Sequence, residues 1–186
     1  HIERVVATAT QLAREEGANM DILLPAAWLH DCVSVPKNHP QRKQASVLAA
    51  DRAIEFLTEI DYPSEHYDAI HHAIVAHSFS ANITPTTLEA KILQDADRMD
   101  ALGAIGISRC ILVGGKLDRQ LYDAVDPLSE HREPDDEVFT IDHFFVKLLT
   151  LGESMQTQAA KAEAQRRSDY MRGFLTQLKS EVLTLD

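Results

Sequence analysis

The chain of 186 residues is poor in several residue types, and each shortage excludes a class of protein. Seven glycines and seven prolines are too few for a fibrous or low-complexity chain. Two cysteines, Cys32 and Cys110, cannot form a disulfide framework, which favours a reducing, cytoplasmic location. No apolar run approaches the roughly 18 residues of a membrane span, and no signal-peptide pattern is present.

Positive charge is also in short supply. Lys and Arg number 18 against 29 Asp and Glu, which gives a formal net charge of −11 at pH 7. Such a chain lacks the basic surface with which proteins bind duplex nucleic acid. A small anionic substrate remains compatible with this charge, because local cations or a metal ion can hold it.

Histidine, by contrast, is concentrated in one part of the chain. Seven of the nine histidines fall in the first 77 residues, namely His1, His30, His39, His66, His71, His72 and His77. A metal site would account for this crowding, and so would chance.

The residue pattern predicts an all-α fold. Residues that favour helices dominate, and strictly alternating runs rich in Val, Ile and Thr are absent. We expect helices at residues 1–16, 21–31, 43–58, 64–76, 87–113, 137–151 and 155–184. The absence of a repeat or linker predicts a single domain, with its core at residues 1–115 and a C-terminal helical extension at residues 116–186.

The second predicted helix should be central and buried, because residues 22–29 are apolar on every side. Asp21 would cap this helix, with Pro25 near its first turn. It ends in His30 and Asp31, which need partners in an apolar interior. A bound metal ion would be one such partner. A capped helix end is the alternative, although the helix dipole there favours His and repels Asp.

The fifth predicted helix carries further acidic residues. At about 100° per residue, Asp97 falls on the apolar face and points inward. Asp95 falls on the charged edge near Lys91 and Arg98, which predicts a surface ion pair. Asp100 is compatible with a supporting role at a site or with a hydrogen bond to a neighbouring loop.

Three ordered segments resemble the HD-domain superfamily of metal-dependent phosphohydrolases. The segments are His1-x-x-Arg4-Val5, His30-Asp31 and Asp95-Ala96-Asp97-Arg98-Met99. Further strings are similar to the YedJ-like bacterial subgroup, which includes nucleoside triphosphate pyrophosphohydrolases. These strings are residues 37–42, 72–80, 89–92, 101–106, 142–144 and 147–149. Family members carry additional residues before the first motif histidine, so we expect a segment upstream of His1. If His1 were instead a residue of a purification tag, it would have no role.

The resemblance implies an HD-type helical bundle in which His1, His30, Asp31 and Asp97 bind one divalent ion. Two imidazoles and two carboxylates suit Mn²⁺, Mg²⁺, Fe²⁺ or Co²⁺, and the absence of cysteine argues against structural zinc. The implied reaction is attack of metal-activated water on a phosphoryl group, with Asp31 also orienting the water.

Substrate contacts follow from charge and position. Arg42 and Lys43 lie in or beside the loop that follows Asp31, although a solvated helix start is their alternative. The substrate-binding candidates are Arg4, His39, Arg42, Lys43 and Ser46. His72 and His77 are candidates for proton transfer to the leaving group. On one continuous helix they diverge by about 140°, so both reach one site only if the helix breaks before His77.

The function most consistent with these features is cleavage of a nucleoside triphosphate to monophosphate and pyrophosphate. A 5′-nucleotidase or a non-catalytic nucleotide or metal sensor remains an alternative. A weaker possibility is a helical interaction module in which residues 137–184 pair between subunits. We expect a monomer or a homodimer with a small phosphorylated substrate.

Overall fold

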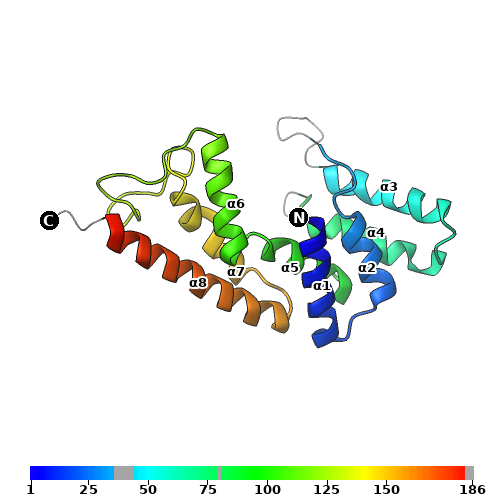
Figure 1. Cartoon of the computed structure of the whole chain (residues 1–186). Coiled ribbons are helices and arrows are strands. Elements are labelled where there is room, and N and C mark those ends of the chain that lie inside the picture. The colour runs from blue at the N-terminus through cyan, green and yellow to red at the C-terminus, as the bar shows by residue number, and fades with distance from the viewer. Residues whose placement is uncertain (36–43, 79–80, 183–186) are drawn as a thin grey trace. The chain divides into compact units, whose positions relative to one another are not determined.

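The computed structural model describes residues 1–35, 44–78 and 81–182, and the all-α prediction is confirmed there (Figure 1). Within those ranges no strand forms, and Gln120 and Phe139 make an isolated bridge. Two compact units are present. Unit 1 contains His1–Met99 and Gln156–Ala160, and unit 2 contains Asp100–Met155 and Lys161–Asp186. The single domain with a C-terminal extension stays a prediction.

Unit 1 is a bundle in which α4 packs against α2, α3 and α5, and α1 packs against α2 and α5. The helices are α1 (Ile2–Glu16), α2 (Met20–Leu29), α3 (Ala45–Glu59), α4 (Tyr67–His77) and α5 (Leu88–Met99), with a 3₁₀ turn, η2, at Ser64–His66. The apolar stripe of α1 faces the core through Val5, Ala9, Leu12 and Ala13. Its predicted end after residue 16 is confirmed, since Gly17 follows as the C-cap and adopts a φ of 77° that other residues disfavour.

The second helix differs from its prediction at its start and at its surface. Asn19, rather than Asp21, is the N-cap, and its side chain accepts a hydrogen bond of 2.9 Å from the Asp21 amide. Only one face is buried, because Trp28 remains 49% exposed and Leu24 39% exposed. The helix is too apolar for periodicity to reveal which of its sides meets solvent.

The predicted long helix at residues 87–113 is wrong, because the chain breaks it in two. Helix α5 ends at Met99, and α6 (Gly103–Lys116) begins after the extended residue Leu102. Gly103 has a φ of 69°, which interrupts the helical conformation. Both segments bury apolar residues, so the hydrophobic pattern continues across the break and hides it. The Asp100 carboxylate accepts a hydrogen bond from Arg109 of α6, which gives this residue a structural partner.

The surface ion pair predicted for Asp95 is also wrong, because this residue is fully buried. Its carboxylate accepts hydrogen bonds from the Gln156 amide at 2.8 Å, the Thr157 amide at 2.9 Å and the Thr157 hydroxyl at 2.8 Å. These donors directly precede α8 (Gln158–Val182). Burial raises the pKa of Asp95, and the three hydrogen bonds oppose that rise. Asp95 therefore stabilises the segment that leads into α8.

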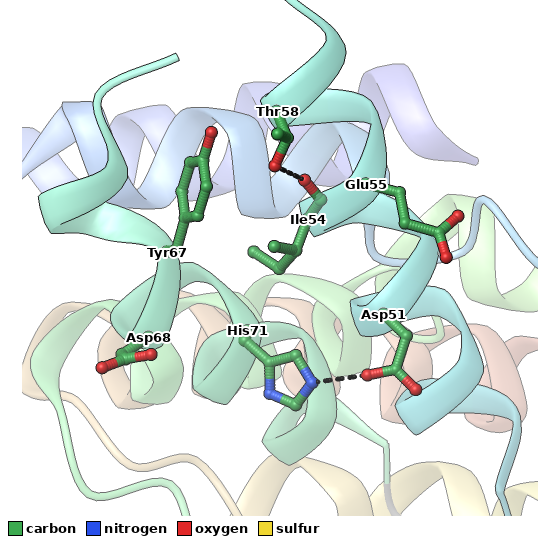
Figure 2. A pocket seen from close by; sticks show the side chains of 7 residues that line it. All are labelled: Asp51, Ile54, Glu55, Thr58, Tyr67, Asp68 and His71. Atoms are coloured by element: carbon green, nitrogen blue, oxygen red, sulfur yellow. Dashed lines mark hydrogen bonds and ion pairs between the residues drawn. The ribbon is translucent and has the colours of Figure 1, made fainter. Parts of the chain in front are cut away.

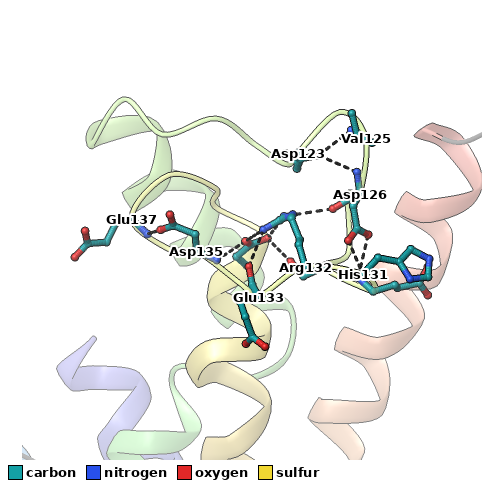
Figure 3. A network of polar contacts seen from close by, with 11 residues as sticks. Asp123, Val125, Asp126, His131, Arg132, Glu133, Asp135 and Glu137 are labelled. Carbon is teal, nitrogen blue, oxygen red and sulfur yellow. Dashed lines mark hydrogen bonds and ion pairs between the residues drawn. The ribbon is translucent and has the colours of Figure 1, made fainter.

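Unit 2 contains α6, a π-helical turn at Phe144–Leu148 (η4), α7 (Leu149–Glu153) and most of α8. Residues 117–136, between two of the predicted helices, form no helix, and the helix predicted from residue 137 begins only at Asp142. A network of acidic residues and Arg132 orders this region (Figure 3). Its centre is Asp142, a fully buried carboxylate that pairs with Arg132. The chain before Asp142 is thus held by polar contacts and not by a helix.

Candidate metal centre

The structure brings together all four side chains that the family pattern implies as ligands. His1 is the N-cap of α1, and His30 is the C-cap of α2 with Asp31 directly after it. Asp97 lies in the last turn of α5. Because α1 packs on both α2 and α5, the ends of three helices deliver these groups to one place. We call His1, His30, Asp31 and Asp97 the HD cluster.

Each imidazole of the HD cluster faces both carboxylates. Nε2 of His1 lies 3.2 Å from Oδ1 of Asp97 and 3.7 Å from Oδ2 of Asp31. Nε2 of His30 lies 3.9 Å and 3.8 Å from the same two oxygen atoms. Four potential ligand atoms therefore converge.

His30 shows why this convergence suits a cation. The side chain is fully buried, and its Nδ1 donates a hydrogen bond of 2.8 Å to the Ala27 carbonyl oxygen. That bond leaves the lone pair on Nε2, and this buried atom has no hydrogen-bond partner in the described part of the chain. Burial, and then the charge of His77, hold the pKa of His30 below its ordinary value. A neutral imidazole nitrogen facing two carboxylates fits a bound metal ion.

The two carboxylates of the HD cluster also suit a bound cation. Burial alone would raise the pKa of Asp97, but the hydrogen bond with His1 and the charges of His77 and His30 bring it below its ordinary value. The side chain of Asp31 is 53% exposed, so it borders solvent. The HD cluster thus combines an enclosed side at His30 with an open side at Asp31.

His77 joins this arrangement from a fourth helix. It is the last residue of α4, and its Nδ1 donates a hydrogen bond of 2.5 Å to the Ile74 carbonyl oxygen. Its Nε2 lies 3.8 Å from Oδ1 of Asp31, whereas Oδ2 of the same carboxylate faces His1 and His30. His30, Asp31 and His77 form a second group whose potential ligand atoms lie within 4.8 Å of one another. The sequence pointed to His77 through its position near the end of a predicted helix and through the family-like string at residues 72–80.

The remaining predicted site residues have varied positions. Helix α4 continues through His77, and His72 instead accepts a hydrogen bond of 3.1 Å from the Thr86 amide. Arg4 is exposed on α1, one turn after His1, and Ser46 is buried in the first turn of α3. Three further candidates lie outside the described residues, namely His39, Arg42 and Lys43.

The thiol beside the HD cluster does not belong to the ligand set. Cys32 donates a hydrogen bond of 3.3 Å from Sγ to the Ala49 carbonyl oxygen. Burial raises the pKa of this thiol, which keeps it protonated and unsuited to a metal. The donor set therefore consists of imidazole nitrogens and carboxylate oxygens, which suits a divalent ion of hard or borderline character.

A separate hollow of about 600 Å³ lies between α3 and α4 (Figure 2). Its lining contains the acidic residues Asp51, Glu55 and Asp68, and Nε2 of His71 lies 3.0 Å from Asp51. No residue of the HD cluster lines it. This hollow is therefore distinct from the candidate metal centre, and its His71–Asp51 pair offers a comparison with the pairs in the HD cluster.

Comparison with known proteins agrees with this geometry. The HD domain family matches residues 1–102. YpgQ of Bacillus subtilis is 30% identical over 190 residues, covering 100% of this chain and 84% of that protein.

Crystal structures are similar over nearly the whole chain. An HD-superfamily hydrolase from Bacillus thuringiensis has a TM-score of 0.76 and 35% identity, with coverage of 97% of this chain and 84% of that one. YpgQ crystallised in complex with ADP has a TM-score of 0.74 and 29% identity, with coverage of 100% and 90%. The chain belongs to the HD domain family and is one of its metal-dependent phosphohydrolases.

Proposed function

We propose that this enzyme cleaves nucleoside triphosphates to monophosphate and pyrophosphate, with the HD cluster as the ligand set of one divalent ion. The observation that carries the proposal is the buried Nε2 of His30, which has no hydrogen-bond partner and faces two carboxylates. The complex of the related YpgQ with ADP supports a nucleotide as the ligand. Mn²⁺, Mg²⁺, Fe²⁺ and Co²⁺ all suit the donor set.

The metal and the protein supply different parts of the chemistry. When bound, a divalent ion activates water as a nucleophile and draws charge from a phosphoryl oxygen. Oδ2 of Asp31 faces His1 and His30, whereas Oδ1 of Asp31 faces His77. This second oxygen accepts a hydrogen bond from the attacking water and orients it. Because Asp31 borders solvent, the substrate approaches from its side.

His77 is placed to exchange a proton near the scissile bond. Its Nδ1 is committed to the Ile74 carbonyl oxygen, so its Nε2 receives or releases the proton. His72 stays a weaker candidate, since its Nε2 must first leave Thr86. Arg4 supplies a positive charge one helical turn from His1, where it meets a substrate phosphate. Contacts by His39, Arg42 and Lys43 stay predictions.

The test is a panel of nucleotides incubated with Mn²⁺, Mg²⁺ or Co²⁺, with products resolved by phosphorus NMR. The expected products are pyrophosphate and a nucleoside monophosphate. Orthophosphate in their place would identify a 5′-nucleotidase, and metal binding with no turnover would identify a sensor. Asp97→Asn should abolish turnover. Asp51→Asn is the matched control, because it alters an aspartate that also contacts a histidine but lies outside the HD cluster.

A further inference from the structure

Helix α3 begins without a side-chain cap. The first N–H groups of an α-helix lack partners within the helix and carry partial positive charge. Gln44, the N-cap, makes no side-chain hydrogen bond to them, and the first turn contains no acidic residue. A 15-residue helix with this start attracts a phosphate group.

Ser46 gives this helix start a second donor. It is the second residue of α3, it is 4% exposed, and its Oγ has no hydrogen-bond partner among the residues that the structure describes. A buried hydroxyl without a partner is unfavourable and is uncommon in folded proteins. Side chains tilt toward the N-terminus of their helix, so this hydroxyl is directed toward the first-turn amides. The unmet hydrogen bond and the helix start therefore point to the same ligand.

The second turn of α3 contacts the residue that follows the HD cluster. Sγ of Cys32, the residue after Asp31, donates to the Ala49 carbonyl oxygen at 3.3 Å. Ala49 follows Ser46 by three residues, which is about 4.5 Å along a helix axis. A chain of phosphates that starts at the HD cluster can therefore continue to the first turn of α3.

We propose that the first turn of α3, with the hydroxyl of Ser46, is the subsite for the two distal phosphates of the substrate. These phosphates become the leaving pyrophosphate, and Ser46 donates a hydrogen bond to one of their oxygens. The inference rests on the proposed function, which it makes more specific. It implies that the substrates carry two phosphates beyond the scissile bond. A nucleoside monophosphate would make no contact with the first turn of α3.

The experiment compares Ser46→Ala with Ser168→Ala. Ser168 is also buried, at 3% exposure, and its Oγ also has no hydrogen-bond partner, but it belongs to unit 2. Each substitution removes an unpaired buried hydroxyl, so both proteins should fold and neither should melt at a lower temperature. Inorganic pyrophosphate binding to the metal-free proteins is measured by titration calorimetry. We expect Ser46→Ala to weaken binding about tenfold, whereas Ser168→Ala should match the unaltered protein.

Three outcomes separate this subsite from the proposed reaction. Equal affinity of Ser46→Ala and the unaltered protein, or no pyrophosphate binding by the unaltered protein, overturns the subsite even when triphosphates are hydrolysed. Weakened pyrophosphate binding by Ser46→Ala alone, together with unchanged binding of a nucleoside monophosphate, supports the subsite. That result would stand even if no nucleotide were hydrolysed, in which case only the proposed reaction fails.

Discussion

Two groups of carboxylates in this chain have opposite surroundings. In unit 2, Asp142 accepts hydrogen bonds from the Ser129 hydroxyl at 3.0 Å, the Asp135 amide at 2.6 Å and both terminal nitrogens of Arg132. In unit 1, the carboxylates of the HD cluster face imidazole nitrogens, one of which is buried without a hydrogen-bond partner.

The difference separates a carboxylate that stabilises the fold from carboxylates that can bind a cation. A buried carboxylate surrounded by protein donors has its charge balanced within the fold, so it stabilises the chain locally. Carboxylates that converge with neutral imidazoles leave negative charge and a nitrogen lone pair for an external cation. The number of acidic residues does not distinguish a structural carboxylate from a metal-binding one. The hydrogen-bond donors that the protein places around each carboxylate do. Each prediction below alters one side of this comparison.

The largest effect should come from breaking the unit 2 network. Asp142→Ala leaves Arg132 and the Asp135 amide without their buried partner, which should cost about 3 kcal/mol in the free energy of unfolding. Urea denaturation monitored by circular dichroism measures it. Asp97→Asn, made in the HD cluster of the metal-free protein, should lose much less stability, because the side chain of Asp97 is 30% exposed and solvent screens its interactions with the imidazoles. Equal losses in the two variants would contradict the comparison.

A divalent ion should stabilise the protein through the HD cluster. At a free Mn²⁺ concentration of 100 times the dissociation constant, we expect a gain of about 2.7 kcal/mol and a higher melting temperature. A chelator should reverse the gain. Differential scanning calorimetry of Asp97→Asn should show no gain with Mn²⁺, while Asp51→Asn should respond like the unaltered protein. A response retained by Asp97→Asn would exclude the proposed ligand set.

A smaller loss is expected at the start of α8. Asp95→Ala removes the acceptor for the Gln156 and Thr157 amides, which should cost about 2 kcal/mol. Lys91→Ala tests the surface ion pair that the helical pattern suggested, and it should change stability by less than about 0.5 kcal/mol. Thermal unfolding of both variants provides the measurement. A larger loss for Lys91→Ala than for Asp95→Ala would restore the surface interpretation.

The smallest predicted effect is a local loss of amide protection at low pH. The amide hydrogen bond from His131 is the main cause that holds the pKa of Asp126 below its ordinary value; burial opposes it, and the amide hydrogen bond from Glu130 adds to it. Such a group adds stability above the ordinary aspartate pKa of about 3.9, and this contribution disappears as pH falls through the lower folded-state value. The protection factors of the two amides against hydrogen exchange should therefore fall below about pH 4. In Asp126→Asn this fall should be absent, and constant protection in the unaltered protein would contradict the assignment.

Periodicity anticipated much of the fold because unit 1 is built from helices with one apolar side, such as α1. It missed the break at Gly103, since apolar residues continue through it. It misplaced Asp95 because a helical pattern contains no information about the distant residues Gln156 and Thr157. Contacts between segments far apart in sequence decide such positions.

The site could be anticipated for a different reason. His1, His30, Asp31 and Asp97 lie in three ordered segments that carry the family resemblance, so their proximity followed from the resemblance and not from periodicity. Their role as ligands stays a prediction. The unpaired Nε2 of His30 and the two orientations of the Asp31 oxygens became visible only with the packed helices.

Anomalous diffraction from a crystal soaked in Mn²⁺, recorded at the manganese absorption edge, tests the metal centre most directly. We expect one strong peak bonded to Nε2 of His30 and to oxygens of Asp31 and Asp97, with His1 completing the protein ligands. A crystal that contains Mn²⁺ elsewhere but shows no peak among these four side chains would contradict the proposed centre.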